Sequence, residues 1–259
     1  MAGKLGKKAA VRPFGLHALS SYMLGKPPAP PTSAHYGGLV TVPFGMDGNG
    51  PDSLVTNQGP DFQGVGDCVM AEKDHALKVA NAIVKVLLDE PVDELPTPTA
   101  DEIVAEYFVL TGGQDTGLDI ASTLQVWQST GLFGTKIAAY APVNYQNLVE
   151  LHQAVAFFGL CEIGIAVQQA QMDQFDADQE WVWEPSSPVI GGHDVCITGY
   201  EPDGVWVATW GKLQKCSYQF LANAMDEAWV VLLPEFKAAQ KGPKLDWTAL
   251  EADLSQLNS

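Results

Sequence analysis

The chain has 259 residues, with 14 Lys and Arg against 31 Asp and Glu, so its net charge is −17. This balance argues against a basic nucleic-acid-binding surface, because phosphate binding needs clustered positive charge. The hydrophobic content of 46% is enough to build a core, which argues against global disorder.

The charge is divided unevenly along the chain. Residues 1–46 contain five basic residues and no acidic residue, whereas residues 47–259 contain 9 basic and 31 acidic residues, a net charge of −22. Prolines at 27, 28, 30 and 31 and the glycines that follow them predict an irregular N-terminal arm over residues 1–50. Two interpretations are open: the arm lies against its own acidic body or simply stays solvated, or it grips an acidic partner surface during assembly.

Neither a classical secretory signal nor a membrane span is expected. The basic residues of the arm are not followed by an apolar run of the length that a signal peptide needs. The most apolar window, Leu151–Val167, contains His152, Gln153 and Glu162 and therefore does not suit a bilayer core. Four cysteines are too few for a dense disulfide framework, so we expect reduced thiols and a cytoplasmic or virion location.

The first half of the body reads as three helices. The first runs from Cys68 to Glu90, with Asp67 as its N-cap. The second starts at a capping box formed by Thr99 and Glu102 and stops at a pair of glycines, and the third spans residues 119–130. The apolar positions recur at helical spacing in each of them.

The second half predicts a sheet. A helix over 147–158 leads into β-prone runs at 160–167, 193–200, 205–210 and 227–233, two of which are joined by a Pro-Asp-Gly turn. A short amphipathic helix is expected near residues 246–257. Helices followed by a sheet indicate an α+β fold, whose two halves can face each other across a cleft.

One cysteine stands apart from the other three. Cys161 and Cys196 lie within apolar strands and Cys216 lacks an adjacent glycine turn or helix start, so all three are predicted to be structural. A tight glycine turn delivers Cys68 to the first turn of a long helix, where the helix dipole and free N–H groups stabilise a thiolate. The Cys68 amide can also point at a developing oxyanion.

A thiolate nucleophile needs a base, and His193 is the best candidate. His17, His35 and His152 are better explained by surface or packing roles. His75 lies two helical turns from Cys68, roughly 10 Å along the axis, which is too far for proton transfer. His193 follows Gly191 and Gly192 and opens a strand, so it is held rigidly with room for a substrate beside it.

These segments resemble papain-like cysteine peptidases over about residues 55–235. The segment from Gln63 to Cys68 resembles the family's oxyanion and nucleophile segment, and Gly192-His193 with residues up to 200 resembles its histidine strand. Residues 205–211, ending Thr-Trp-Gly, resemble the strand that follows. The resemblance implies a papain-like domain over 51–235, between an arm (1–50) and a C-terminal spacer with a short helix (236–259). Several short motifs look more narrowly like papain-fold proteins of bacteriophages and actinobacteria.

The sequence departs from the family pattern in two places. Ala208 stands where the family has the Asn that orients the histidine, so Thr209, Asp194 or a backbone carbonyl must do this instead. Gln63 lies one residue closer to the cysteine than usual. We favour it over Gln58 as the oxyanion donor because of its glycine-turn context.

The sequence therefore predicts a thiol hydrolase that cleaves a peptide or amide bond through an acyl-enzyme. Cys68 and His193 form the catalytic pair and Gln63 assists; Gly66, Asp67, Gly192 and Trp210 line the substrate cleft. No metal or other cofactor is expected, since no zinc-ligand spacing or phosphate-binding glycine loop is found. The alternative is a non-catalytic papain-fold assembly protein of a phage virion, with protein partners held by the arm. Neither the substrate nor the oligomeric state follows from the sequence.

Overall fold

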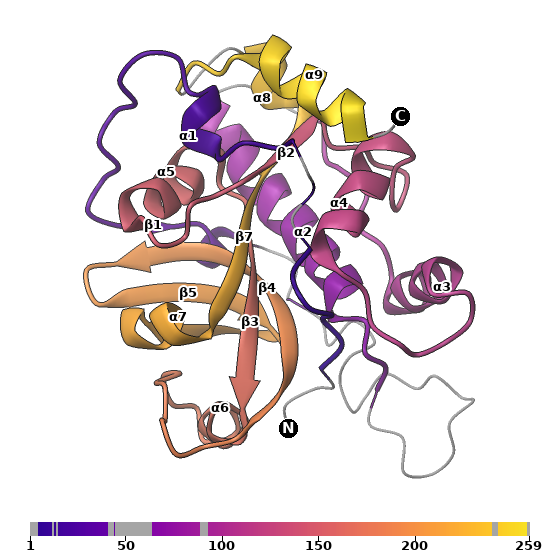
Figure 1. The fold of residues 1–259 in the computed structure, drawn as a ribbon, viewed down its shortest axis with the longest axis vertical. Coiled ribbons are helices and arrows are strands. Elements are labelled where there is room, and N and C mark those ends of the chain that lie inside the picture. The colour runs from indigo at the N-terminus through magenta and orange to yellow at the C-terminus, as the bar shows by residue number, and fades with distance from the viewer. Residues whose placement is uncertain are drawn as a thin grey trace.

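The computed structural model describes residues 5–11, 13, 15–40, 44, 64–88, 93–239 and 243–257. Within these residues the strands form one antiparallel sheet in the order β2-β7-β3-β4-β5-β6, and a short β1 pairs with β4 (Figure 1). The strands are β1 (Ala34–His35), β2 (Ala139–Pro142), β3 (Cys161–Gln168), β4 (Val189–Glu201), β5 (Gly204–Thr209), β6 (Lys212–Ser217) and β7 (Met225–Leu232).

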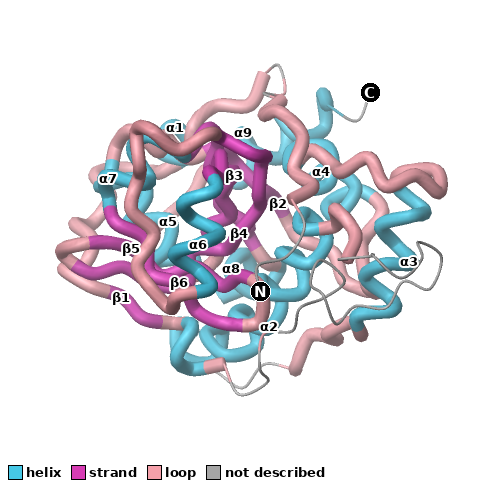
Figure 2. The backbone as a smooth tube through the Cα atoms, turned by 90° about the horizontal axis from the view of Figure 1, so that it is seen from below, coloured by secondary structure: helices cyan, strands magenta, loops and turns pink. Residues whose placement is uncertain are grey.

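The helices surround this sheet. They are α1 (Leu19–Tyr22), the 3-10 turn η1 (Gly37–Leu39), α2 (Cys68–Leu88), α3 (Ala100–Leu110), α4 (Ile120–Ser129), α5 (Leu148–Phe158), α6 (Gln169–Asp176), α7 (Tyr218–Ala224), α8 (Pro234–Ala239) and α9 (Trp247–Leu257). Helix α2 packs against β4 and also contacts α3 and α4. Both ribbon views place α3 and α4 at one end of the molecule, away from α7 (Figures 1 and 2). The mixed α+β architecture is thus confirmed.

Local signals in the sequence set several helix ends. The capping box is formed, because Thr99 Oγ1 accepts from the Glu102 N–H while the Glu102 carboxylate accepts from the Thr99 N–H. Helix α5 ends at Gly159, whose φ of 74° lies in the left-handed region that glycine adopts at low cost. A Cβ at Gly159 would also overlap the Ile83 side chain, so this glycine lets α5 approach α2 closely.

The structure adds elements that the sequence pattern did not predict. Helix α6 was not predicted, because its sequence is mainly polar; only Gln171 and Phe175 of it are buried. Strands β2 and β6 and helices α7 and α8 were also not expected. The arm contains α1, β1 and η1 rather than irregular chain alone. Among the described helices, none combines the length and apolar character that a bilayer crossing requires.

Candidate active site

Cys68 is the first residue of α2, and a glycine turn leads into it. Gly64 has a φ of 92°, which favours glycine at this point of the turn. The turn is held by its neighbours: the Gly66 N–H donates to Asp115 Oδ1 over 2.9 Å, and the Tyr107 hydroxyl donates to the same oxygen over 2.7 Å. Cys68 is buried, with 1% of its surface exposed. The thiol therefore lies at a rigid helix start, closed off from solvent.

His193 is held from two directions within β4. Its Nε2 lies 2.7 Å from Thr209 Oγ1, and its ring stacks on Trp210 with the centroids 4.5 Å apart and the planes 19° apart. The other ring nitrogen, Nδ1, is buried without a hydrogen-bond partner among the described residues. The imidazole thus has one nitrogen anchored, one face covered by an indole, and one nitrogen available for proton transfer.

Of the three groups considered for orienting His193, Thr209 is the one that makes the hydrogen bond. Ala208 lies inside β5, paired with Cys196 and Leu213, and its methyl group offers no polar atom. Thr209 ends the strand, just before a turn in which Trp210 and the next residue both have positive φ. The hydrogen bond to His193 thus comes from the residue after Ala208, at the point where β5 turns back.

The sulfur of Cys68 lies beside the backbone of the histidine strand. Burial raises the pKa of Cys68 to about 12, and the negative charge of Asp194 adds to this; backbone hydrogen bonds from Asp194 and Gly6 act in the opposite direction. Burial also lowers the pKa of His193 to about 3, assisted by His75. Both groups are therefore neutral in this arrangement, as a thiol and an imidazole.

The expected oxyanion donor lies outside the described residues. Both Gln63 and the alternative Gln58 fall in the segment 45–63. The turn that follows Gln63 is described, and Val65, Gly66 and Asp67 are buried next to the thiol. The role of Gln63 stays a prediction.

The chain's own N-terminal arm lies across this site. The Lys7 N–H donates to the Gly192 carbonyl over 3.1 Å, the Lys8 N–H donates to the Leu118 carbonyl over 2.8 Å, and the Leu118 N–H donates to the Gly6 carbonyl over 3.1 Å. The segment is thus bridged on one side to the helical half and on the other to β4. Of the two interpretations of the arm, its described part takes the first and lies against its own body.

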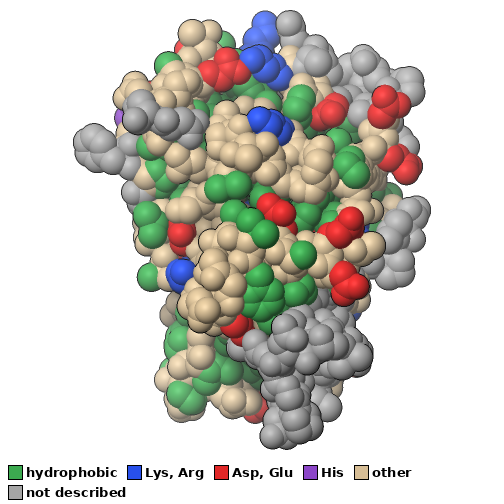
Figure 3. All heavy atoms as spheres, turned by 90° about the vertical axis from the view of Figure 1, so that its right-hand side faces the viewer, with side chains coloured by type: hydrophobic (Ala, Val, Ile, Leu, Met, Phe, Trp, Pro, Cys, Tyr) green, Lys and Arg blue, Asp and Glu red, His purple; other side chains and the backbone are tan. Residues whose placement is uncertain are grey.

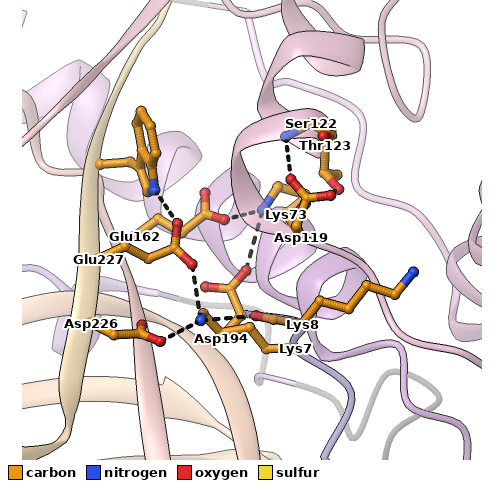
Figure 4. Close-up of polar contacts among 11 residues, drawn as sticks. Lys7, Lys8, Lys73, Asp119, Ser122, Thr123, Glu162, Asp194, Asp226 and Glu227 are labelled. Atoms are coloured by element: carbon orange, nitrogen blue, oxygen red, sulfur yellow. Dashed lines mark hydrogen bonds and ion pairs between the residues drawn. The ribbon is translucent and has the colours of Figure 1, made fainter. Parts of the chain in front are cut away.

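A buried charge cluster lies behind Cys68, and the sequence analysis did not identify it. Lys73 of α2 pairs with Glu162 of β3 and has its Nζ 3.5 Å from Asp194 Oδ2 (Figure 4). Its Nζ also lies 3.0 Å from Glu72 Oε2. Burial raises the pKa of Glu72 to about 8, with Glu162 adding to the rise. The three carboxylates lie close enough together to surround one cation, and the Lys73 ammonium lies among them. In the sequence, the signal for this cluster was a glutamate, Glu162, within the apolar run 160–167. The cluster ties α2 to β3 and β4.

The other cysteines and His152 have packing environments. Cys161, Cys196 and Cys216 are free thiols buried in strands, and burial raises their pKa values. His152 stacks on Tyr200, with the ring centroids 4.0 Å apart, and its Nε2 lies 2.8 Å from the Tyr218 hydroxyl. These contacts agree with structural roles.

Comparison with known proteins supports the fold. No family pattern and no curated protein matches the sequence. Among solved structures, xylellain, a cysteine protease from Xylella fastidiosa, is similar with a TM-score of 0.58 and 13% identity, covering 89% of this chain and 96% of that one. The cysteine protease and lectin-like domains of Cwp84, a surface layer associated protein of Clostridium difficile, match with a TM-score of 0.56 and 13% identity, covering 88% of this chain and 56% of that one.

These solved structures support only the fold part of the resemblance drawn from the sequence. They give no support to the narrower likeness to proteins of phages and actinobacteria, which stays a prediction. At this level of identity they establish the fold and not the chemistry. The chain has the fold of papain-like cysteine proteases.

Proposed function

We propose that the protein is a thiol hydrolase that cleaves a peptide or amide bond through Cys68 and His193. The single observation that supports this best is the environment of His193. One ring nitrogen is bonded to Thr209, one face is covered by Trp210, and Nδ1 has no hydrogen-bond partner among the described residues. A histidine placed only for packing has no need of an unpaired buried nitrogen, because such a group costs about 1–3 kcal/mol.

The reaction follows from this arrangement. His193 takes the thiol proton at Nδ1, and the Cys68 sulfur attacks the carbonyl carbon, whose oxygen becomes an anion near the Cys68 amide and, by prediction, Gln63. The C–N bond breaks as His193 returns the proton to the leaving amine, which yields an acyl-enzyme. Water then gives a proton to His193, attacks the thioester carbon and releases the acid, and the proton goes back to the sulfur.

Thr209 would act as a positioning residue. Its hydroxyl can accept a hydrogen bond from Nε2–H, which keeps Nδ1 as the proton-accepting nitrogen of the neutral imidazole and stabilises the imidazolium formed in each step. Trp210 excludes water from that hydrogen bond, so the bond is stronger than an exposed one.

The arm must leave before substrate binds. With the arm in place the thiol is buried and its pKa is raised to about 12, so almost no thiolate exists near neutral pH. Displacing the arm removes part of the burial that causes this rise. The described structure therefore corresponds to the resting form of the proposed enzyme.

A second candidate function is a non-catalytic assembly protein, such as a component of a phage virion. The arm that covers the thiol and the raised thiol pKa favour it, because a structural protein has no need to open the site. Figure 3 shows the side of the molecule on which α3 and α4 lie, and acidic side chains predominate among the charged ones coloured there, which would suit a basic protein partner.

Alkylation of Cys68 by iodoacetamide at pH 7, followed by mass spectrometry, separates the two candidates. The full chain is compared with Lys7→Glu, which sets a negative charge against Asp226 and Glu227 and expels the arm. We expect Cys68 of Lys7→Glu to react at least about tenfold faster than the same thiol in urea. Adding His193→Ala should remove this advantage, whereas adding His152→Ala, the matched control, should not. A rate no higher than in urea would support the assembly role.

A further inference from the structure

Lys7 places its ammonium against two acidic side chains, Asp226 and Glu227, which form an acidic slot. Its side chain is 1% exposed, and its Nζ lies 3.0 Å from Asp226 Oδ2 and 2.9 Å from Glu227 Oε1 (Figure 4). A buried ammonium is costly unless charged partners replace the lost water. The two carboxylates at the start of β7 provide this compensation.

The slot is shaped for a long unbranched side chain. Gly164 of β3 forms its floor, and a Cβ at that position would overlap the Cε of Lys7. Glu227 is 4% exposed and is held in place by the Trp229 indole N–H, which donates to its Oε2 over 2.8 Å. The side chain of Asp226 is 46% exposed, so the slot opens to solvent on that side. A floor without a side chain, one carboxylate held in place and a second carboxylate at the solvent-facing end would suit a lysine.

The slot adjoins the reacting atoms. Lys7 donates its N–H to the carbonyl of Gly192, the residue before His193, and its neighbour Gly6 makes a backbone hydrogen bond to the Cys68 sulfur. An extended chain that follows this path past the Cys68 sulfur therefore places a side chain in the slot. That side chain belongs to the residue next to the one at the sulfur.

We propose that the slot formed by Gly164, Asp226 and Glu227 is the side-chain recognition site for substrate and selects a lysine, with Lys7 as its internal occupant. This inference rests on the proposed thiol hydrolase function and names its substrate class: peptides that carry a lysine beside the bond to be cleaved. The acidic pair at the end of the slot discriminates against neutral and acidic side chains.

The arm occupies the slot without being positioned for cleavage. Attack requires a carbonyl carbon at the sulfur, with its oxygen directed toward the oxyanion donors. Gly6 instead presents its N–H to the sulfur, and its carbonyl accepts from the Leu118 N–H over 3.1 Å. Lys7 thus fills the recognition site while the reacting atoms are held apart.

Peptide binding tests the slot independently of catalysis. The probe is fluorescein-labelled Leu-Gly-Lys-Lys-amide, measured by fluorescence anisotropy with full-length protein carrying Cys68→Ala to prevent turnover. We expect it to bind the Lys7→Ala form at least about tenfold more tightly than the form with Lys7, whose arm competes. Lys7→Glu is run alongside, so that the result does not depend on one variant folding.

Two controls address the chemistry of the slot. Replacing the first lysine of the probe by norleucine, which keeps the chain length, should weaken binding at least about tenfold, as should Glu227→Gln in the protein. Asp203→Asn, which removes an exposed carboxylate paired with Lys215, should change nothing. Equal binding of the lysine and norleucine probes, or no binding to either Lys7 variant, would overturn the proposal.

The outcomes separate this proposal from the proposed function. If Cys68 of Lys7→Glu is reactive but the lysine and norleucine probes bind equally, the hydrolase proposal holds and the slot proposal is wrong. If binding depends on the lysine but Cys68 is unreactive, the slot is a binding site and the hydrolase proposal is wrong.

Discussion

Replacing Thr209 by Val tests whether this residue orients the proposed base. The substitution keeps the shape of the side chain and removes the hydroxyl that lies 2.7 Å from His193 Nε2. Leaving a buried polar atom unpaired costs about 1–3 kcal/mol. If the loss of this hydrogen bond destabilises the His193 imidazolium by that amount, the rate of Cys68 alkylation falls roughly 5- to 150-fold, because each 1.36 kcal/mol corresponds to a factor of ten.

The assay is alkylation of Cys68 in the Lys7→Glu background over a pH series. We expect Thr209→Val to shift the rise in rate to higher pH, because the thiolate loses part of its stabilisation by the imidazolium. Thr209→Ser, which retains the hydroxyl, should restore the original profile. A merely structural role would lower the amount of folded protein without moving the profile.

A second substitution tests the position from which His193 is oriented. Ala208→Asn puts the family's orienting residue at its usual place in the sequence, but residue 208 lies inside β5 between Cys196 and Leu213. We therefore expect no rescue when it is combined with Thr209→Val. A Thr209→Val profile identical to that of the parent protein, or rescue by Ala208→Asn, would refute the assignment of Thr209.

Two further predictions follow from the buried charges and the slot. The pKa of Glu72 is raised to about 8, so its folded-state proton is lost as pH rises through 8, and stability should fall between about pH 5 and 8. The side chain of Glu72→Gln is neutral at every pH, so this substitution should reduce the decrease in unfolding free energy over this pH range by roughly 2–4 kcal/mol, as measured by urea unfolding. An unchanged pH dependence of the unfolding free energy would contradict this. Gly164→Ala should expel Lys7 and speed Cys68 alkylation while abolishing lysine-probe binding, because its methyl group fills the slot. Gly38→Ala, whose methyl would meet nothing within 4 Å, is the control, and equal effects of the two substitutions would count against the slot.

Much of the fold could be predicted because its signals are local. The capping box at Thr99, the glycine after α5 and the turn before β5 each act within a few residues, and their elements form where the pattern placed them. Helix α6 was missed for the same reason: its polar sequence lacks an apolar stripe, and Gln168 and Gln171, rather than Ser or Thr, form its capping box.

The candidate site was predictable only in part. A glycine turn at a helix start selects Cys68 among four cysteines, and a glycine pair at a strand selects His193 among five histidines. The sequence also limits the orienting group to Thr209, Asp194 or a backbone carbonyl. Choosing among these requires the register of β4 against β5, which depends on pairing across the sheet rather than on neighbouring residues.

The sequence by itself determined that an acidic body follows a basic arm, but the tertiary structure decided where one charge of that arm lies. Lys7 meets Asp226 and Glu227, which are more than two hundred residues away along the chain. Composition records only the sum of such charges. The pairing appears once β7 lies beside β3 and the arm lies against β4, because an ion pair depends on distance in space and on the exclusion of water.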